Sequence, residues 1–306
     1  MPGKWNVKML KKRILIIGSN GMLGQRLVEH FSTRIDVELL LTSAEEKSFF
    51  DNLTYRTLDI TNKKDVKKVV LDFYPDTIIN VAAYTNVDKC ETEKNIAMDI
   101  NANGVEYLAK YSVASHSHLI QISTDYVFDG CCGPYSETDL PNPISYYGRS
   151  KLAGENIIRK FNIPYTIIRT NVLFGTAKFG RPDFVKWVVQ SLGENKKIRI
   201  VTDQINNPTY LDDLVSGISK VSDLKKTGLF NIGGAELLTR YEFTQKIAEY
   251  FNLDFNLVEP IKTEELNQPA PRPLKSGLIN LKAETEIGYK PHTINECLEL
   301  MKKGWN

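Results

Sequence analysis

The sequence has few cysteines, no long hydrophobic run and almost no net charge, and each absence excludes a class of protein. Four cysteines in 306 residues, Cys90, Cys131, Cys132 and Cys297, are too few for a disulfide framework, and none of their spacings is that of a metal-binding knuckle. They favour a reducing compartment, so we expect a cytoplasmic protein. No run approaches the roughly 18 apolar residues that cross a membrane, so we expect no membrane partner. The formal net charge of +2 is too balanced for binding a nucleic-acid backbone mainly by charge.

The first part of the sequence alternates short apolar runs with amphipathic helical patterns. The apolar runs predict strands at residues 13–17, 37–41, 54–58, 77–81, 118–122 and 165–169. Apolar residues spaced three and four apart predict helices at residues 21–32, 62–73, 91–115 and 147–160. Strands that alternate with helices form parallel sheets, because parallel neighbours need a crossover connection. The predicted fold is therefore α/β, with a Rossmann-type doubly wound parallel sheet. An antiparallel α+β fold would need hairpin turns, and the Asn-Gly pairs lie at helices instead.

The pattern becomes less regular after residue 175. It predicts a strand at residues 197–201 and helices at residues 183–192, 211–221, 241–251 and 294–303. This part lacks a βαβ series of its own. We therefore expect residues 13–175 to form a dinucleotide-binding domain, which can share strands with later segments. Residues 176–306 are expected to form mainly a smaller C-terminal substrate-binding lobe.

A glycine-rich turn follows the first predicted strand and opens the first predicted helix. It reads Gly18-Ser19-Asn20-Gly21-Met22-Leu23-Gly24, with glycine at every third position. Glycine permits a tight turn, a close approach of backbone to a pyrophosphate, and close packing of helix on strand. The helix N-terminus offers unpaired N–H groups to phosphates. The motif predicts a dinucleotide site, and the alternative is a glycine-rich turn that binds no ligand.

The residues after the second predicted strand bear on the choice of cofactor. Thr42-Ser43-Ala44 carries neither the acid that would bind the ribose 2′-hydroxyl of NADH nor an arginine for the 2′-phosphate of NADPH. Glu45 and Glu46 follow slightly later. We expect both NADPH and NADH to serve, with a modest preference for NADPH. No pattern of histidines or cysteines predicts a metal site, and a structural magnesium ion is left open.

Tyr147 and Lys151 are four residues apart in a predicted helix and so share one face of it. An ammonium beside a phenol favours the phenolate and would lower the tyrosine pKa, which suits proton transfer. The spacing alone is not specific, because Tyr165 and Arg169 are also four apart. In a strand, however, residues at that spacing lie about 13 Å from each other.

Polar residues also follow three of the predicted strands. Thr124 closes the fifth strand, residues 80–88 follow the fourth, and Asp59 with Ile60 follows the third. Ligands of open α/β sheets bind outside the carboxyl ends of the strands. These residues and the glycine turn are therefore expected to face one site, although polar residues also begin ordinary loops.

Six segments together resemble the dTDP-4-dehydrorhamnose reductase family of extended short-chain dehydrogenases. They read G-S-N-G-M-L-G, N-V-A-A-Y-T-N-V-D, S-T-D-Y-V-F-D-G, Y-Y-G-R-S-K-L-A-G-E, D-Q-I-N-N-P-T and R-P-L-K-S. The resemblance runs from about residue 13 to residue 280. It implies NAD(P)H-dependent reduction of the C4 ketone of a nucleotide-linked 6-deoxy-4-keto sugar, with dTDP-4-dehydro-L-rhamnose to dTDP-L-rhamnose as the expected reaction.

The resemblance also implies roles for individual residues. Tyr147 resembles the proton donor, Lys151 its helper on the nicotinamide ribose, and Thr124 the residue near the substrate carbonyl. The remaining roles are the pyrophosphate turn at Gly21, Met22 and Leu23, flanked by Gly18 and Gly24; the adenine end at Asp59 and Ile60; the nicotinamide side at Ala83, Tyr84 and Thr85; and substrate contacts from Asp125 and Arg272. A guanidinium at Arg272 would suit the substrate diphosphate.

One position departs from the family pattern, and two other functions stay open. Many relatives carry a serine and then a tryptophan that lines the substrate pocket, where this chain has Asn171 and Val172, so the sugar and nucleotide are left open. A nucleotide-sugar epimerase or dehydratase could share the fold, although Thr124-Asp125-Tyr126 argues against dehydration. The regulatory subunit of methionine adenosyltransferase resembles the same family without being catalytic. A homodimer is also left open.

Overall fold

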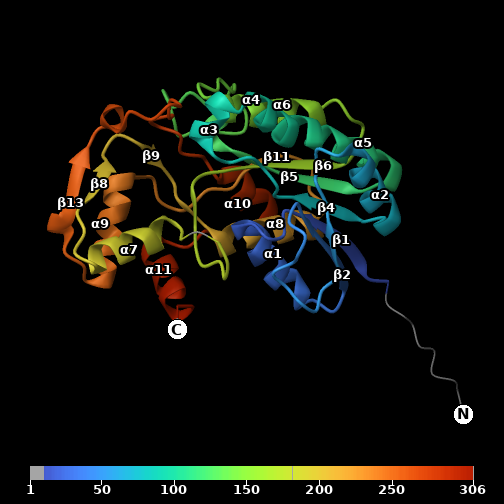
Figure 1. Ribbon diagram of the computed structural model, residues 1–306, viewed down its shortest axis with the longest axis horizontal. Coiled ribbons are helices and arrows are strands. Elements are labelled where there is room, and N and C mark those ends of the chain that lie inside the picture. The colour runs from blue at the N-terminus through green and yellow to red at the C-terminus, as the bar shows by residue number, and fades with distance from the viewer. Residues whose placement is uncertain (1–9, 181, 306) are drawn as a thin grey trace, which may run out of the picture.

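The computed structural model describes residues 10–180 and 182–305, and its centre is a seven-stranded sheet (Figure 1). The strand order is β3 (Tyr55–Thr57), β2 (Val37–Ser43), β1 (Lys12–Ile17), β4 (Thr77–Asn80), β5 (His118–Thr124), β6 (Tyr165–Thr170) and β11 (Gly228–Asn231). Every neighbouring pair in this sheet is parallel. The direction of winding reverses between β1 and β4, which confirms the Rossmann-type prediction.

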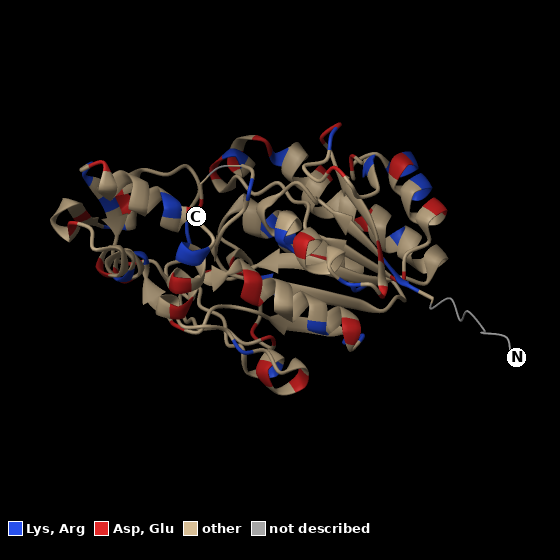
Figure 2. Ribbon diagram, turned by 90° about the horizontal axis from the view of Figure 1, so that it is seen from below, with Lys and Arg blue, Asp and Glu red and all other residues tan. Residues whose placement is uncertain are grey.

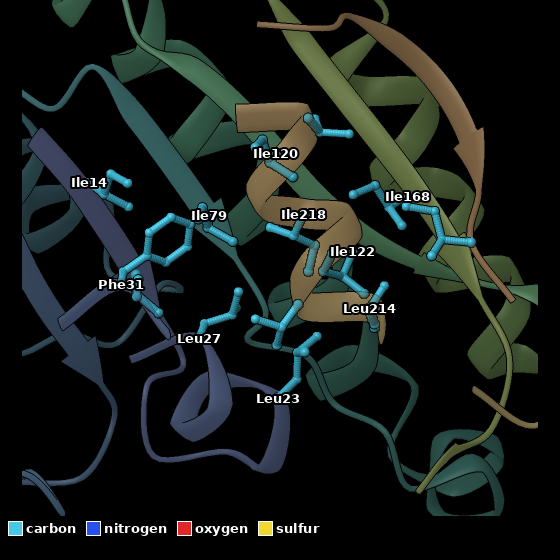
Figure 3. Packing of buried hydrophobic residues seen from close by; sticks show 14 of the residues in the cluster. Ile14, Leu23, Leu27, Phe31, Ile79, Ile120, Ile122, Ile168, Leu214 and Ile218 are labelled. Atoms are coloured by element: carbon cyan, nitrogen blue, oxygen red, sulfur yellow. The ribbon is translucent and has the colours of Figure 1, made fainter. Parts of the chain in front are cut away.

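Helices cover both faces of the sheet. One face packs on α1 (Met22–Ser32), α8 (Leu211–Asp223) and α10 (Leu281–Ile287), and the other on α2 (Lys63–Phe73), α5 (Gly104–Ser115) and α6 (Tyr146–Ile158). Figure 3 shows the first layer, where Leu27 and Phe31 of α1 lie beside Leu214 and Ile218 of α8 over the sheet. The strands are buried on both sides, which explains their nearly continuous apolar sequences.

Side-chain caps explain where several helices begin. Asn62 accepts hydrogen bonds from the backbone of the first turn of α2, and Ser145 does the same for α6. Capping boxes start α9 (Arg240–Phe251) at Thr239 and α11 (Ile294–Lys303) at Thr293. Such caps satisfy N–H groups that the helix itself leaves unpaired.

A smaller lobe lies at one end of the sheet, on the left of Figure 1. It packs α7 (Phe184–Gly193), α9 and α11 around the parallel pair β8 (Ile198–Val201) and β13 (Val258–Ile261). Two short pairs complete the strands: β7 (Leu173–Phe174) beside β10 (Thr209–Tyr210), and β9 (Ile205–Asn206) beside β12 (Leu238–Thr239). The elements α8, β11 and α10 also follow residue 175 but pack on the main sheet, so the two lobes interleave along the chain.

The prediction of one continuous helix over residues 91–115 is wrong. The chain forms α3 (Val87–Thr92), α4 (Lys94–Met98), a π-helical turn η1 (Asp99–Asn103) and then α5. A π turn inserts one extra residue into a helix and turns a side chain inward, often at a functional site. Here the turn holds buried Asn101, which hydrogen-bonds outside its own helix.

The charged residues are mixed in sign over the surface. Figure 2 shows Lys and Arg interspersed with Asp and Glu along the outer helices, with no broad face of one sign in that view. Among the helices of the described residues, none has the length and apolar character needed to span a membrane. All four cysteines are free, with Cys90 and Cys297 buried and Cys131 and Cys132 exposed.

Candidate active site

The glycine turn connects β1 to α1 in a conformation that needs glycine at two positions. Gly18 has φ +85°, and a Cβ there would lie 2.8 Å from the backbone nitrogen of Ala82. A Cβ on Gly24 would lie 2.1 Å from the Gly18 carbonyl oxygen. Both contacts are with backbone atoms, which cannot move aside as a flexible side chain can. The turn therefore packs closely against the segment that follows β4 and against its own helix, as the motif predicts.

The N-terminus of α1 suits a phosphate group. Gly21 is its N-cap residue, no side chain caps the helix, and its first turn contains no acid that would repel an anion. The hydroxyl oxygen of Ser19 in the same turn is buried and has no hydrogen-bond partner among the described residues. These donors fit the pyrophosphate of a dinucleotide.

A cavity of about 340 Å³ lies beside this helix end at the carboxyl edge of the sheet. The predicted residues in its lining are Gly21, Met22, Leu23, Gly24, Ala83, Thr85, Thr124, Tyr147 and Lys151. The other lining residues are Val81, Ile122, Ser123, Thr170, Asn171 and Leu173. The structure thus brings the glycine turn, two strand ends and helix α6 to one site.

A second cavity of about 260 Å³ continues from the first along the glycine turn. Gly21, Val81 and Ala83 line both cavities, and Gly18, Asp59 and Ile60 line only the second. Ser43, Ala44 and Glu45 also face it, whereas Glu46 does not. The predicted adenine end at Asp59 and Ile60 therefore lies in a cavity that shares its lining with the one beside the glycine turn.

Tyr84 faces neither cavity. Its hydroxyl donates to the Glu93 carboxylate, and this hydrogen bond is the main reason that the pKa of Tyr84 is raised to about 12. Its backbone N–H and carbonyl pair with the Asn101 side chain, at 2.9 and 3.0 Å. Tyr84 therefore supports the segment between Ala83 and Thr85 through its backbone, while its ring packs away from the cavities.

Lys151 is 5% exposed, and its ammonium donates to the Ile122 carbonyl oxygen at 2.6 Å. Burial lowers the pKa of Lys151 to about 8, and the nearby Glu155 carboxylate opposes this shift. The sequence predicts that Lys151 lowers the pKa of Tyr147. Burial acts in the other direction and raises the pKa of Tyr147 well above its ordinary value, while a hydrogen bond with Thr124 lowers it in part. A buried phenol keeps its proton because its anion would lose solvation.

Below Lys151, one turn along α6, Glu155 forms a buried ion pair with Arg169 of β6. The Arg169 Nε and Nη2 donate to the two Glu155 oxygens at 2.9 and 2.7 Å. The Ser123 hydroxyl donates to the same carboxylate at 2.6 Å. This network joins α6 to the ends of β5 and β6, so it holds the strand that carries Thr124.

Thr124 and Asp125 have different surroundings despite being adjacent. Thr124 lines the first cavity, and its hydroxyl donates to Asp125 Oδ1 at 3.0 Å. Asp125 lines neither of the two cavities, is 1% exposed, and accepts a hydrogen bond from Ser276 Oγ at 2.5 Å. Asp125 therefore connects β5 to the C-terminal segment beside the site, and its contact with substrate stays a prediction.

Asn101 was not singled out by the sequence. Its amide nitrogen donates to Ser150 Oγ of α6 at 2.9 Å. The same amide group also accepts from the Tyr84 N–H and donates to the Tyr84 carbonyl. A Cβ on Gly154 of α6 would lie 2.3 Å from the Asn101 carbonyl oxygen, so the helix and the π turn are in close contact. Asn101 thus fixes the spacing between α6, which carries Tyr147, and the strand end at Ala83.

A third cavity of about 300 Å³ lies between the lobes and contains Arg272. Its lining also includes groups that no sequence pattern indicated: Phe184, Trp187, Arg199 and Arg240. The Arg240 guanidinium lies 4.7 Å from the Phe184 ring centroid, and no carboxylate pairs with it among the described residues. Arginines and aromatic rings in one hollow suit a nucleotide. Val172 lines none of these cavities, while Asn171 lines the first.

No cluster of three or more His, Cys, Asp or Glu side chains within residues 10–180 and 182–305 is arranged to hold a metal ion.

Comparisons with known proteins identify the family to which the chain is similar. The family described as RmlD substrate binding domain matches residues 12–304. A dTDP-4-dehydrorhamnose reductase of Aggregatibacter actinomycetemcomitans is 33% identical over 94% of this chain and 97% of its own length. The crystal structure of dTDP-4-dehydrorhamnose reductase from Bacillus anthracis, in complex with NADP, is 35% identical and has a TM-score of 0.86 over 96% of this chain and 100% of that one. Methionine adenosyltransferase 2 subunit beta of Mus musculus is 30% identical over 91% of this chain and 84% of its own.

Proposed function

The chain belongs to the RmlD substrate binding domain family, and from this premise we propose that it is an NAD(P)H-dependent reductase that converts dTDP-4-dehydro-L-rhamnose to dTDP-L-rhamnose. The resemblance predicted from its motifs is confirmed by the family match. The observation that carries the proposal is one cavity in which Thr124, Tyr147 and Lys151 face the glycine turn.

The chemistry assigned to these residues is delivery of a proton to the ketone oxygen. When bound, NAD(P)H supplies the hydride that reduces the ketone carbon. Tyr147 is the proton donor, and its raised pKa keeps it protonated at neutral pH, which is the form that a donor needs. Thr124 would supply a second hydrogen bond to the same oxygen by turning its hydroxyl from Asp125 to substrate.

Lys151 has two tasks in this proposal. With a pKa of about 8 it is mostly protonated at pH 7, so its ammonium can stabilise negative charge developing near Tyr147. The hydrogen bond to the Ile122 carbonyl fixes the ammonium at the edge of the cavity, where it can also hold a ribose hydroxyl.

We assign the nucleotide part of the substrate to the third cavity. Arg240 and Arg272 offer guanidinium groups for a diphosphate, and Phe184 and Trp187 offer aromatic surface for a base. The thymine base of this assignment comes from the relatives that are named dTDP-4-dehydrorhamnose reductase.

For the cofactor, we propose that both NADPH and NADH are used, with NADPH modestly preferred. Ser43 and Ala44 at the second cavity leave room for a 2′-phosphate, while Glu45 is the acid that could instead bind a ribose hydroxyl. The test is the ratio of kcat/KM for the two cofactors. A preference for NADH above about a hundredfold, ~2.7 kcal/mol, would contradict the proposal and assign Glu45 to the ribose.

Two further proposals concern the cellular location and the oligomeric state of the enzyme. A cytoplasmic location would give it access to the reduced nicotinamide that each turnover consumes, and localisation of a tagged chain tests this. A homodimer is the assembly that we propose, and light scattering on the purified protein distinguishes it from a monomer.

The deciding experiment measures NADPH oxidation with dTDP-, UDP- and GDP-linked 4-keto sugars. We expect turnover with the dTDP sugar, and Tyr147→Phe should lower kcat by about 10²–10⁴-fold while NADPH still binds. Wild-type turnover in Tyr147→Phe would refute the assignment of the donor. Copurified, tightly held cofactor without net oxidation would indicate an epimerase.

A second candidate function is regulation without catalysis, and the similarity to methionine adenosyltransferase 2 subunit beta is the observation that favours it. Absence of turnover with every 4-keto sugar, together with cofactor binding, would support that reading over the reductase.

A further inference from the structure

We infer that Asp88 is a positioning residue for the sugar nucleotide, which clamps the Arg272 guanidinium so that one edge of it is presented to phosphoryl oxygens. This inference rests on the proposed function, because it assigns the diphosphate to the third cavity. Asp88 is the second residue of α3 and follows the segment that lines the first cavity. Arg272 lies on the C-terminal segment that closes the third cavity.

The clamp accounts for three of the five N–H groups of Arg272. Nη1 donates to Asp88 Oδ1 at 2.7 Å and to the Ala270 carbonyl at 2.7 Å, and Nη2 donates to Asp88 Oδ2 at 2.8 Å. Within residues 10–180 and 182–305, the Nε–H and the second N–H of Nη2 have no hydrogen-bond partner. These two donors lie on the same side of the guanidinium, and such an edge matches a pair of phosphate oxygens.

Asp88 also fixes the backbone that carries Arg272. Its Oδ1 accepts a hydrogen bond from the Ala270 N–H at 3.2 Å, so a single carboxylate holds both the side chain and the chain segment before it. The pairing with Arg272 lowers the pKa of Asp88, which therefore stays ionised at neutral pH. The side chain of Arg272 is 9% exposed, so the clamp restricts a guanidinium that is nearly enclosed.

The other two arginines of the cavity are held differently. Arg199 approaches Glu259 and Glu265 only at 3.8 and 3.5 Å, with half of its side chain exposed. Arg240 has no carboxylate partner among the described residues. Arg272 is thus the arginine of this cavity that a carboxylate holds through two short hydrogen bonds. Without this carboxylate, Arg272 would gain rotational freedom that binding must remove again, at a cost in affinity.

The test compares Asp88→Asn, Arg272→Ala and the double variant by calorimetric titration with dTDP, with UDP and GDP as alternatives. An asparagine places an amide N–H against the guanidinium and keeps only one acceptor. We expect Asp88→Asn to weaken dTDP binding about tenfold, the effect of one well-placed charged hydrogen bond. In the Arg272→Ala background, Asp88→Asn should cause no further loss, because the residue acts through Arg272.

Two controls separate positioning from structural damage. Asp72→Asn removes the partner of Arg56, another Asp–Arg pair, far from the cavity on α2, and should leave dTDP binding unchanged. NADPH affinity, measured by fluorescence, should be the same in Asp88→Asn as in wild type. In steady-state assays Asp88→Asn should raise KM for the sugar nucleotide about tenfold and change kcat less than about twofold. If Asp88→Asn does not fold, Arg272→Lys, which keeps the charge but loses the paired edge, should show the same KM effect.

Four results would overturn the inference. Two concern Asp88→Asn itself: unchanged dTDP affinity, or tighter dTDP binding, which would mean that Asp88 competes with phosphate. The others are an equal loss of dTDP affinity when Asp88→Asn is added to Arg272→Ala, and no binding of dTDP, UDP or GDP. Failure of the proposed reaction looks different. A protein that binds dTDP through Asp88 and Arg272 but reduces no 4-keto sugar would refute the reductase and support the clamp.

Discussion

Asp125 should make the stability of this protein depend on pH in a direction opposite to that of most carboxylates. It is 1% exposed at the end of β5, and hydrogen bonds from Ser276 and Thr124 do not compensate its loss of solvent. Burial therefore raises its pKa from 3.8 to about 6. The perturbation is Asp125→Asn, which keeps the shape and removes the titration.

The magnitude follows from linkage between protonation and folding. Because the folded pKa lies above the unfolded one, the native state binds the proton more tightly between them, and stability is lost as the pH rises through about 6. A shift of about two units corresponds to about 3 kcal/mol. About 2 kcal/mol of this falls between about pH 4.5 and about pH 7.5. The asparagine variant does not lose this stability as the pH rises. It is instead less stable at every pH by about 1–3 kcal/mol, because its amide nitrogen cannot accept the hydrogen bond from Ser276.

Urea denaturation of both proteins across this pH range measures the effect. We expect the free energy of unfolding of Asp125→Asn, relative to wild type, to rise by about 2 kcal/mol from the acidic to the neutral end. Asp139→Asn is the control, because hydrogen bonds from Ser136 lower the pKa of that exposed carboxyl, so it titrates below this range and the variant should run parallel to wild type. Ser276→Ala should raise the pKa of Asp125 further and steepen the wild-type loss. A difference between Asp125→Asn and wild type that does not change with pH would refute the reasoning.

Three other predictions concern the cavity. Gly24→Ala places a Cβ 2.1 Å from the Gly18 carbonyl oxygen, so we expect about 1–3 kcal/mol less stability and weaker NADPH binding, and wild-type values in urea and fluorescence titrations would contradict this. Because the pKa of Lys151 is about 8, kcat/KM for NADPH should fall as the pH rises through that value; Lys151→Arg should give a flat profile, and a flat wild-type profile would show that the ammonium is not required. Thr124→Val should lower kcat by about 10–10³-fold with NADPH affinity unchanged. If it weakens NADPH as much as Lys151→Ala does, Thr124 is a cofactor ligand instead.

Several features of the fold could be predicted because they depend on local patterns. The apolar runs around Ile16 and Ile120 mark strands that are buried on both faces, and α11 begins and ends at the predicted residues. The glycine turn was readable for the same reason, since a Cβ on Gly24 would meet the backbone of Gly18, six residues away. The family motifs then indicated Tyr147, which lines the first cavity.

The sequence by itself therefore determined the fold class and the glycine turn, because each is encoded by neighbouring residues, and its family motifs predicted the reacting groups. The tertiary structure alone decided the π turn at Asn101, the burial of Asp125, the pairing of Asp88 with Arg272 and the approach of Arg240 to the same cavity. Asp88 and Arg272 are separated by 184 residues in the chain. The solvation and partners of a charged side chain depend on which distant segments pack against it, and local sequence carries no record of that.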